Sequence, residues 1–206
     1  MKRIITIQHT ESEHHLNGMV GSWTDWELSK RGRHEAQQIT TNLTNEFDLN
    51  DFMIYSSDLT RAVQTAQPLA TKLGKEIMLE KRLRERNLGE CCGQSVAWLN
   101  QHKLKDEETI DDRLFPSAES RRESFMRLQS FFDELIENPK DVVLVAHGDI
   151  LTQFYALFLN QKMEILTTLR FQGLAGGVSI FAIDDTVRII EKLNDSRYKQ
   201  IKTDDL

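Results

Sequence analysis

Arg3-Ile4-Ile5-Thr6-Ile7-Gln8-His9-Thr10-Glu11-Ser12 is the stretch that decides the fold of this chain. Its isoleucines are β-branched and apolar, which is typical of a buried strand, and the sequence turns polar at Gln8. Because His9 follows directly, we expect it at the rim of a sheet, where the strand ends, rather than inside the core.

Two later stretches repeat this pattern of an apolar strand, a polar turn and then a helix. Phe52-Met53-Ile54-Tyr55 leads to Ser56-Ser57-Asp58, and Val142-Val143-Leu144-Val145-Ala146 leads to His147-Gly148. In an open α/β sheet, ligands bind outside the carboxyl ends of the strands, near the point where the strand order reverses. We therefore predict a three-layer αβα sandwich with a mostly parallel mixed sheet, in which the three strand ends converge on one site.

The composition is that of an ordinary globular protein. The chain has 206 residues, of which 39% are hydrophobic and 28% charged, enough for one core without disulfides or metal. We predict a single domain over residues 1–206, in which residues 194–206 form a polar tail that frays. The first apolar run is too short for a signal peptide, and no segment approaches a membrane span, so the expected location is the cytoplasm.

Charge and cysteine spacing exclude several classes of partner. The formal net charge is −6 and no basic run occurs, which argues against nucleic acid and anionic membranes. Cys91 and Cys92 are adjacent, fit no zinc or redox spacing, and are expected as reduced thiols. His14 and His15 lie near His9, but no carboxylate or cysteine stands at ligand spacing, so we predict no metal and no cofactor. The sequence does not indicate an oligomeric state.

Arg61 lies in the first turn of the helix that is expected after Asp58, a good N-cap residue. A cation is unfavourable there, because the macrodipole already makes a helix N-terminus positive, so its placement indicates that an anion binds nearby. The alternative is a solvent-exposed arginine that pairs with Asp58.

Periodicity predicts the remaining elements. Ser29 is expected to cap one helix and Pro116-Ser117 to open another. A short helix is expected over residues 95–102 and strands over 77–79, 178–183 and 187–193, the last two joined as a hairpin.

These motifs resemble the histidine phosphatase superfamily, the phosphoglycerate mutase-like fold, over nearly the whole chain. The likeness rests on five motifs in the right order, among which residues 56–66 match the family's most recognisable segment almost residue for residue. The other four are residues 8–12 (Arg-His-Gly-Glu-Thr in the family), 22–32 (Gly-Trp-x-Asp, then Leu-Ser/Thr-x-x-Gly), 83–85 with Gly89 and Gly93 (the proton-donor region) and 146–148 (the second histidine).

The resemblance implies a metal-independent phosphomonoesterase. His9 would be the nucleophile that forms a phosphohistidine, and Arg61 would bind two phosphoryl oxygens with its planar fork. His147 would donate a hydrogen bond to those oxygens, and Glu85 would protonate the leaving alkoxide and then activate water. Each role has a structural alternative: a histidine after a strand is often structural, and Glu85 stands among three arginines that could hold it in a surface ion pair.

The chain departs from the family pattern around the pocket. Gln8 replaces an arginine, and the loss of one charged donor costs ~3 kcal/mol, on the order of a hundredfold in rate. Thr10 and Ser22 replace glycines. His15 replaces a phosphate-contacting asparagine and could restore a donor or, when protonated, part of the missing charge. The phosphate pocket is thus predicted to consist of Gln8, His15, Ser22, Arg61 and His147.

We expect a phosphatase of reduced rate that acts on a small phosphorylated metabolite. One alternative is a phosphoglycerate mutase-type phosphotransferase, which the short chain disfavours because the family's mutases usually carry insertions that enclose a bisphosphate. The other is a non-catalytic protein that binds inorganic phosphate and has lost turnover at Gln8.

Overall fold

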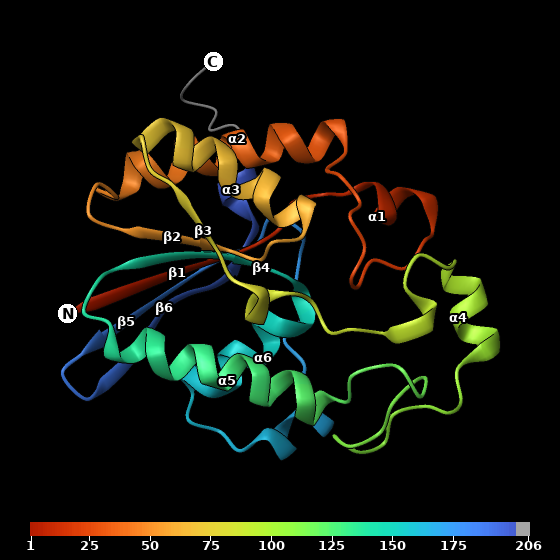
Figure 1. The fold of residues 1–206 in the computed structure, drawn as a ribbon. Helices are drawn as coiled ribbons and strands as arrows, with labels where there is room; N and C mark the ends of the chain where they lie inside the picture. The colour runs from red at the N-terminus through yellow and green to blue at the C-terminus, as the bar shows by residue number, and fades with distance from the viewer. Residues whose placement is uncertain (201–206) are drawn as a thin grey trace.

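The computed structural model describes residues 1–200 and contains a six-stranded sheet with helices on both faces (Figure 1). The strand order is β3-β2-β4-β1-β5-β6. Strands β1 to β4 run parallel to one another, and β5 is antiparallel to both of its neighbours. The predicted mostly parallel mixed sheet is confirmed. The strands are β1 (Lys2–Gln8), β2 (Met53–Ser56), β3 (Ile77–Leu79), β4 (Val142–Ala146), β5 (Val178–Asp184) and β6 (Val187–Asp195).

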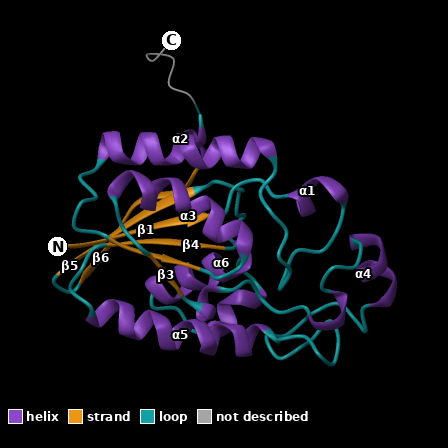
Figure 2. Ribbon diagram, turned by 45° about the horizontal axis from the view of Figure 1, so that its top comes forward, coloured by secondary structure: helices purple, strands orange, loops and turns teal. Residues whose placement is uncertain are grey.

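The helices complete the predicted three layers (Figure 2). Helices α2 (Lys30–Glu46) and α3 (Thr60–Leu73) cover one face of the sheet, and α5 (Arg121–Glu137) and α6 (Gly148–Phe158) cover the other. Two short helices, α1 (Glu13–Asn17) and α4 (Val96–His102), lie beyond the carboxyl ends of the parallel strands. The remaining turns are 3₁₀ helices at Lys81–Leu83, Gly89–Cys91, Met163–Thr167 and Ser196–Lys199.

The two central strands supply both halves of the core. In β1, Ile4 packs with the side of α5 and α6, whereas Ile5 packs with the side of α2 and α3. In β4, Leu144 and Val143 divide in the same way, and every residue of the strand is buried. Since both faces are covered, these strands read in the sequence as continuous apolar runs rather than as alternating ones.

Most helix boundaries agree with the sequence, but the start of α5 was predicted wrongly. Ser29 does cap α2, because its hydroxyl accepts a hydrogen bond from the Gly32 backbone N–H. Helix α5 begins at Arg121 rather than at Pro116-Ser117. Its N-cap is Ser120, which forms a reciprocal capping box with Glu123, and this pair of bonds fixes the first turn.

Residues 194–200 do not form the fraying tail that their polarity suggested. Strand β6 continues to Asp195, and Tyr198 is buried. The Tyr198 hydroxyl donates to Glu46, and the Asn42 amide donates to the Tyr198 carbonyl, so this segment is tied to α2. The rest of the predicted tail, residues 201–206, lies outside the described residues. Among residues 1–200, no helix has the length and apolar character needed to cross a bilayer.

Candidate active site

The two predicted histidines meet at the ends of adjacent strands. His9 follows β1 and His147 follows β4, which pair in parallel with Gln8 opposite Ala146. The His9 backbone N–H donates to the Ala146 carbonyl at 2.9 Å, and the ring centroids of the two histidines are 5.1 Å apart. His9 is 4% exposed and His147 is fully buried. The strand order reverses between these strands, so the pair occupies the position where α/β sheets bind ligands.

Arg61 reaches the same point from the first turn of α3. Its Nε–H donates to His9 Nε2 at 3.3 Å, and the residue is only 1% exposed. Its other two nitrogens donate to the backbone carbonyls of Thr24 (2.7 Å) and Ser22 (2.8 Å). Burial lowers the pKa of Arg61 to about 10, so the guanidinium stays charged at neutral pH. The guanidinium of Arg61 donates to backbone carbonyls in this structure. Its binding of two phosphoryl oxygens therefore stays a prediction, and it requires that Arg61 release the Thr24 and Ser22 carbonyls.

Asp58 does not pair with Arg61, and it does not cap α3. The N-cap position belongs to Leu59, and Asp58 instead accepts two hydrogen bonds from Arg84 at 2.6 and 2.7 Å. These bonds lower the pKa of Asp58. Arg84 also lies over the Trp23 ring, 4.7 Å from its centroid. The alternative reading of Arg61 as an exposed arginine paired with Asp58 is therefore wrong.

The hydrogen bonds of His9 fix its tautomer. Its Nδ1 lies 2.8 Å from the Thr10 carbonyl, to which only an N–H can donate, so Nδ1 carries the proton and the unprotonated Nε2 is the atom that accepts the Arg61 Nε–H. Burial, and then the charge of Arg61, hold the pKa of His9 well below its usual range. His9 is therefore a neutral imidazole whose Nε2 is available as a nucleophile.

In His147 the nitrogen that has a hydrogen-bond partner among the described residues is Nε2, and the nitrogen without one is Nδ1. Its Nε2 lies 2.8 Å from the hydroxyl of Ser57, which already accepts the Leu59 backbone N–H. In the part of the chain that the structure describes, the Ser57 hydroxyl has no other acceptor for its proton, so we assign this proton to the bond with Nε2, which leaves the hydrogen of the neutral ring on Nδ1. Among residues 1–200, Nδ1 is buried without a hydrogen-bond partner. Burial, and then Arg61, hold the pKa of His147 well below its usual range, so the ring offers one free N–H donor.

The Glu85 carboxyl is oriented by backbone rather than by arginine. Its Oε1 accepts from the Arg86 N–H at 2.9 Å and its Oε2 accepts from the Asp149 N–H at 3.3 Å. Burial, and then the nearby Asp149 carboxylate, raise the pKa of Glu85. The neighbouring arginines bind other carboxylates: Arg82 binds Glu80 and Glu134, Arg84 binds Asp58, and Arg86 binds Glu107.

Gln8 and Thr10 lie on either side of His9. The Gln8 amide packs against Gly148 and Gly173, where an added Cβ on Gly173 would come within 2.1 Å of Gln8 Oε1. Thr10 is fully buried, and its hydroxyl donates to the Gly32 carbonyl at 2.8 Å. The Thr10 hydroxyl thus ties the loop to α2.

Ser22 acts on the site through its backbone. Its φ of +49° lies in the left-handed region, which favours glycine, the family's residue at this position. Its hydroxyl donates to the Arg86 carbonyl at 2.7 Å and accepts the Leu88 N–H at 2.8 Å. These bonds hold the Ser22 carbonyl against Arg61, so the structure places the side chain in the loop and the carbonyl at the site.

His15 stacks on His9, with ring centroids 5.4 Å apart and an interplanar angle of 11°. Its Nδ1 accepts the Ser12 backbone N–H at 3.2 Å, so the hydrogen of the neutral ring is on Nε2, an N–H donor like the family's asparagine amide. Burial, and then Arg61, lower the pKa of His15. This shift favours the neutral donor over the charged form.

Sequence reasoning missed Ser57 and Asp149 as partners of the predicted residues. Both stand next to a motif that was recognised: Ser57 follows β2, and Asp149 follows His147-Gly148. Their polar character within three residues of a strand end was the available signal.

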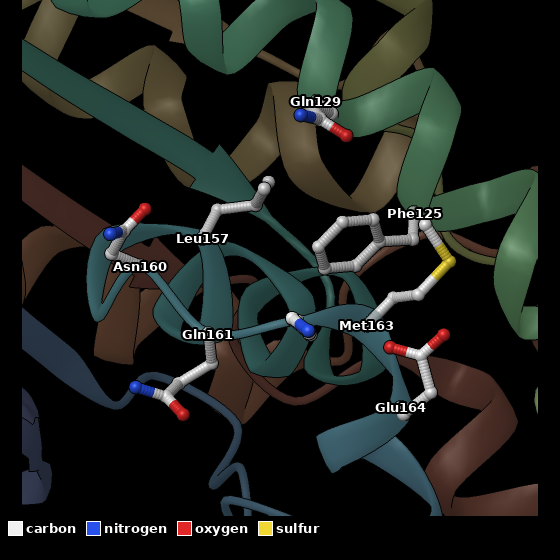
Figure 3. Close-up of a pocket in the computed structure, with 8 residues that line it drawn as sticks. Phe125, Gln129, Leu157, Asn160, Gln161, Met163 and Glu164 are labelled. Carbon is white, nitrogen blue, oxygen red and sulfur yellow. The ribbon is translucent and has the colours of Figure 1, made fainter.

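A separate hollow lies between α5 and the end of α6 with the segment that follows it (Figure 3). Phe125 and Gln129 come from α5, and Leu157, Met163 and Glu164 from the other side. Within residues 1–200, none of the predicted site residues is part of its lining.

Fold and site together define an α/β protein with two histidines and an arginine at the carboxyl edge of the sheet. The chain belongs to the histidine phosphatase superfamily (branch 1), which matches residues 4–196. The earlier assignment from sequence motifs is confirmed.

Relatives in this superfamily are phosphatases and mutases, so the chain belongs to a family of enzymes. It is 27% identical to a glucosyl-3-phosphoglycerate phosphatase of Mycolicibacterium vanbaalenii, with 87% of this chain and 84% of the relative covered. It is 26% identical to a 2,3-bisphosphoglycerate-dependent phosphoglycerate mutase of Bartonella bacilliformis, with 90% and 95% covered. The structure of a phosphoserine phosphatase from Entamoeba histolytica, in complex with 3-phosphoglyceric acid, is 25% identical with a TM-score of 0.74 over 97% of this chain and all of that one (100%).

Proposed function

We propose that this chain is a phosphomonoester phosphatase that acts through a phosphohistidine on His9. One observation carries the proposal: the neutral His9 ring presents its Nε2 lone pair inside a buried site that also holds Arg61 and the free N–H of His147. A phosphoryl dianion bound there would meet a nucleophile, a cation and a hydrogen-bond donor at once.

Hydrolysis then proceeds in two steps. His9 Nε2 attacks phosphorus, the bond between phosphorus and the leaving oxygen breaks, and Glu85 gives that oxygen its proton. In the second step the Glu85 carboxylate takes a proton from water, the water oxygen attacks phosphorus, and the bond to His9 breaks. The His147 Nδ1–H stabilises the charge on the phosphoryl oxygens in both steps. Neither step uses a metal.

The substrate is a small phosphorylated metabolite. The relatives named above include a phosphatase and a mutase of phosphoglycerate-type esters, and one solved relative binds 3-phosphoglyceric acid. Because Gln8 supplies no charge, we expect slower turnover than an arginine at this position would give. The cytoplasmic location stays a prediction from the sequence.

The test is to trap the intermediate. After rapid quenching of a radiolabelled phosphomonoester reaction, the protein should carry phosphate that is lost in acid and stable in base, as a phosphoramidate is. His9→Ala should abolish both the label and the hydrolysis of an aryl phosphate, whereas His34→Ala, at an exposed position of α2, should retain both. Hydrolysis that survives in His9→Ala would contradict the proposal.

The mutase is the second candidate, favoured by the 26% identity to the Bartonella enzyme over 90% of the chain. It predicts interconversion of phosphoglycerates that depends on a bisphosphate primer. A non-catalytic phosphate-binding protein instead predicts a higher melting temperature with phosphate and no turnover.

A further inference from the structure

The geometry points to a Zn²⁺ site formed by His9, His14 and His15. Each ring offers one nitrogen, and these three atoms lie within 4.8 Å of one another. Zinc binds imidazole nitrogen at about 2.0–2.1 Å, which places two ligands of a tetrahedral site about 3.3 Å apart. The donor atoms thus need to approach by about 1.5 Å at most. Side-chain rotation can supply this movement, because His15 is exposed and His14 is half-buried on the short helix α1.

Two of the three rings already have the tautomer and the outer hydrogen bond of a metal ligand. A ligating histidine usually donates its second ring N–H to an oxygen, which fixes the tautomer and the ring orientation. His9 donates Nδ1–H to the Thr10 carbonyl. His14 Nδ1 lies 3.0 Å from the hydroxyl of Ser12, whose own proton is donated to the Glu27 carbonyl, so His14 is the donor there. Both rings therefore present an unprotonated Nε2, which in His9 accepts the Arg61 Nε–H.

His15 completes the set by a change of tautomer. Its Nδ1 now accepts the Ser12 N–H, so metal binding at Nε2 requires that this bond be released and that the proton move to Nδ1. The ring is placed for this role, since its centroid is 4.0 Å from that of His14 and 5.4 Å from that of His9. Three neutral imidazoles and one open position form a donor set that suits zinc and other borderline divalent metals.

Sequence spacing had argued against a metal, because no carboxylate or cysteine stands at ligand spacing. The fold replaces these by bringing His9 from the end of β1 onto the two adjacent histidines of α1. Arg61 opposes a bound cation, since its Nε–H lies 3.3 Å from His9 Nε2. The repulsion between Arg61 and the metal weakens binding, so we expect the metal to dissociate readily. The positive charge of Arg61 also favours an anion as the fourth ligand of the metal.

The consequence for the enzyme is inhibition. A metal on His9 Nε2 occupies the lone pair that the proposed mechanism uses to attack phosphorus, so the bound form cannot be phosphorylated. This consequence rests on the proposed function, whereas the existence of the metal site does not.

Cobalt tests the site directly, because Co²⁺ at nitrogen ligands shows visible d–d absorption. We expect one Co²⁺ per chain, displaced by Zn²⁺. His14→Gln and His15→Asn should each weaken binding by at least about tenfold, whereas His34→Gln should bind like the unaltered chain. Thermal unfolding without metal checks that each variant is folded. Affinity that is unchanged in the His14→Gln, His15→Asn double variant would overturn the site.

Activity separates the two proposals. Zn²⁺ at stoichiometric amounts should stop aryl phosphate hydrolysis by the unaltered chain, and EDTA should restore it. Co²⁺ binding that depends on both histidines but leaves hydrolysis intact would support the metal site and contradict His9 as the nucleophile.

Discussion

Gln8 is the single residue that sets the expected rate. It ends β1 beside His9, and its neutral amide packs against Gly148 and Gly173 at the position where the resemblance implies a cation. We predict that Gln8→Arg raises kcat for an aryl phosphate on the order of a hundredfold, because a charged donor strengthens binding of the transition state. Gln8→Met, of similar length and without charge, is the matched control. Equal rates for the two variants would show that the missing charge does not limit turnover.

Ser57 controls His147 through one hydrogen bond of 2.8 Å. Removing its hydroxyl frees His147 to adopt either tautomer, so fewer molecules present the Nδ1–H donor. We predict that Ser57→Ala lowers kcat by at least about tenfold. Ser56→Ala is the matched control, since the Ser56 hydroxyl donates to the Ser57 carbonyl and not to His147. A loss of the same size in both variants would assign the effect to the strand end rather than to the tautomer.

The Asp149 carboxylate adds to burial in raising the pKa of Glu85, the proposed general acid. This acid works only while protonated, so activity should fall as the pH rises through that pKa. Removing the negative charge lowers the pKa of Glu85. Asp149→Asn is therefore predicted to move the alkaline limb of the kcat profile to lower pH, while Asp149→Glu leaves it near its original place. An unmoved limb in Asp149→Asn would exclude Glu85 as the group that titrates.

At the scale of elements, α2 is locked to the loop that follows His9. A Cβ on Gly32 would lie 1.9 Å from the Glu11 carbonyl oxygen, which explains the glycine in the first turn of this helix. We predict that Gly32→Ala lowers the free energy of unfolding by about 3 kcal/mol, because backbone on both sides has to move. Urea unfolding measures this, with Lys30→Ala, exposed in the same turn, as control. A change in the free energy of unfolding below about 1 kcal/mol would mean that the loop at Glu11 moves to accommodate the added methyl group at little cost.

The sequence predicted best those elements whose position depends on their own residues and not on contacts with distant ones. The apolar run of β4 and the cap at Ser29 carry their signals locally. The errors arose where a contact with a residue distant in the sequence determines the local structure. Asp58 is taken from the helix cap by Arg84, and Tyr198 is drawn into the structure by contacts with α2, although its neighbours are polar. Local composition contains neither of these partners.

At the scale of the whole molecule, the convergence of His9 and His147 was predictable because parallel strands end at one edge. The approach of Arg61 followed from the start of α3. The place of His15 near His9 followed from the family resemblance, whereas the approach of His14 was not predictable, since it depends on how an irregular stretch folds back with a short helix in it. The same holds for the bond from the Asp149 N–H that helps to orient Glu85, which joins residues 64 positions apart.

The cluster of buried neutral imidazoles should make the whole molecule sensitive to acid. The pKa values of His9 and His147 are well below normal and that of His14 is about 3, whereas unfolded histidines titrate near about 6.5. Below that pH the unfolded chain takes up protons that the folded chain does not. The free energy of unfolding should therefore fall with pH, by up to about 1.4 kcal/mol per pH unit for each buried histidine and less for half-buried His14.

Glu85 acts in the opposite direction. Its raised pKa contributes stability that is complete below the unfolded value of about 4.3 and is lost as the pH rises, so one carboxyl offsets part of the effect of the histidines. Urea unfolding at pH 7 and pH 5.5 measures the balance, and the lower pH should give the smaller free energy. His14→Gln should reduce the slope of the unfolding free energy against pH, because up to about one proton fewer is taken up on unfolding. Equal free energies at the two pH values would mean that the folded and unfolded chains take up the same net number of protons over this range, which would contradict the predicted excess of the histidine effect over that of Glu85.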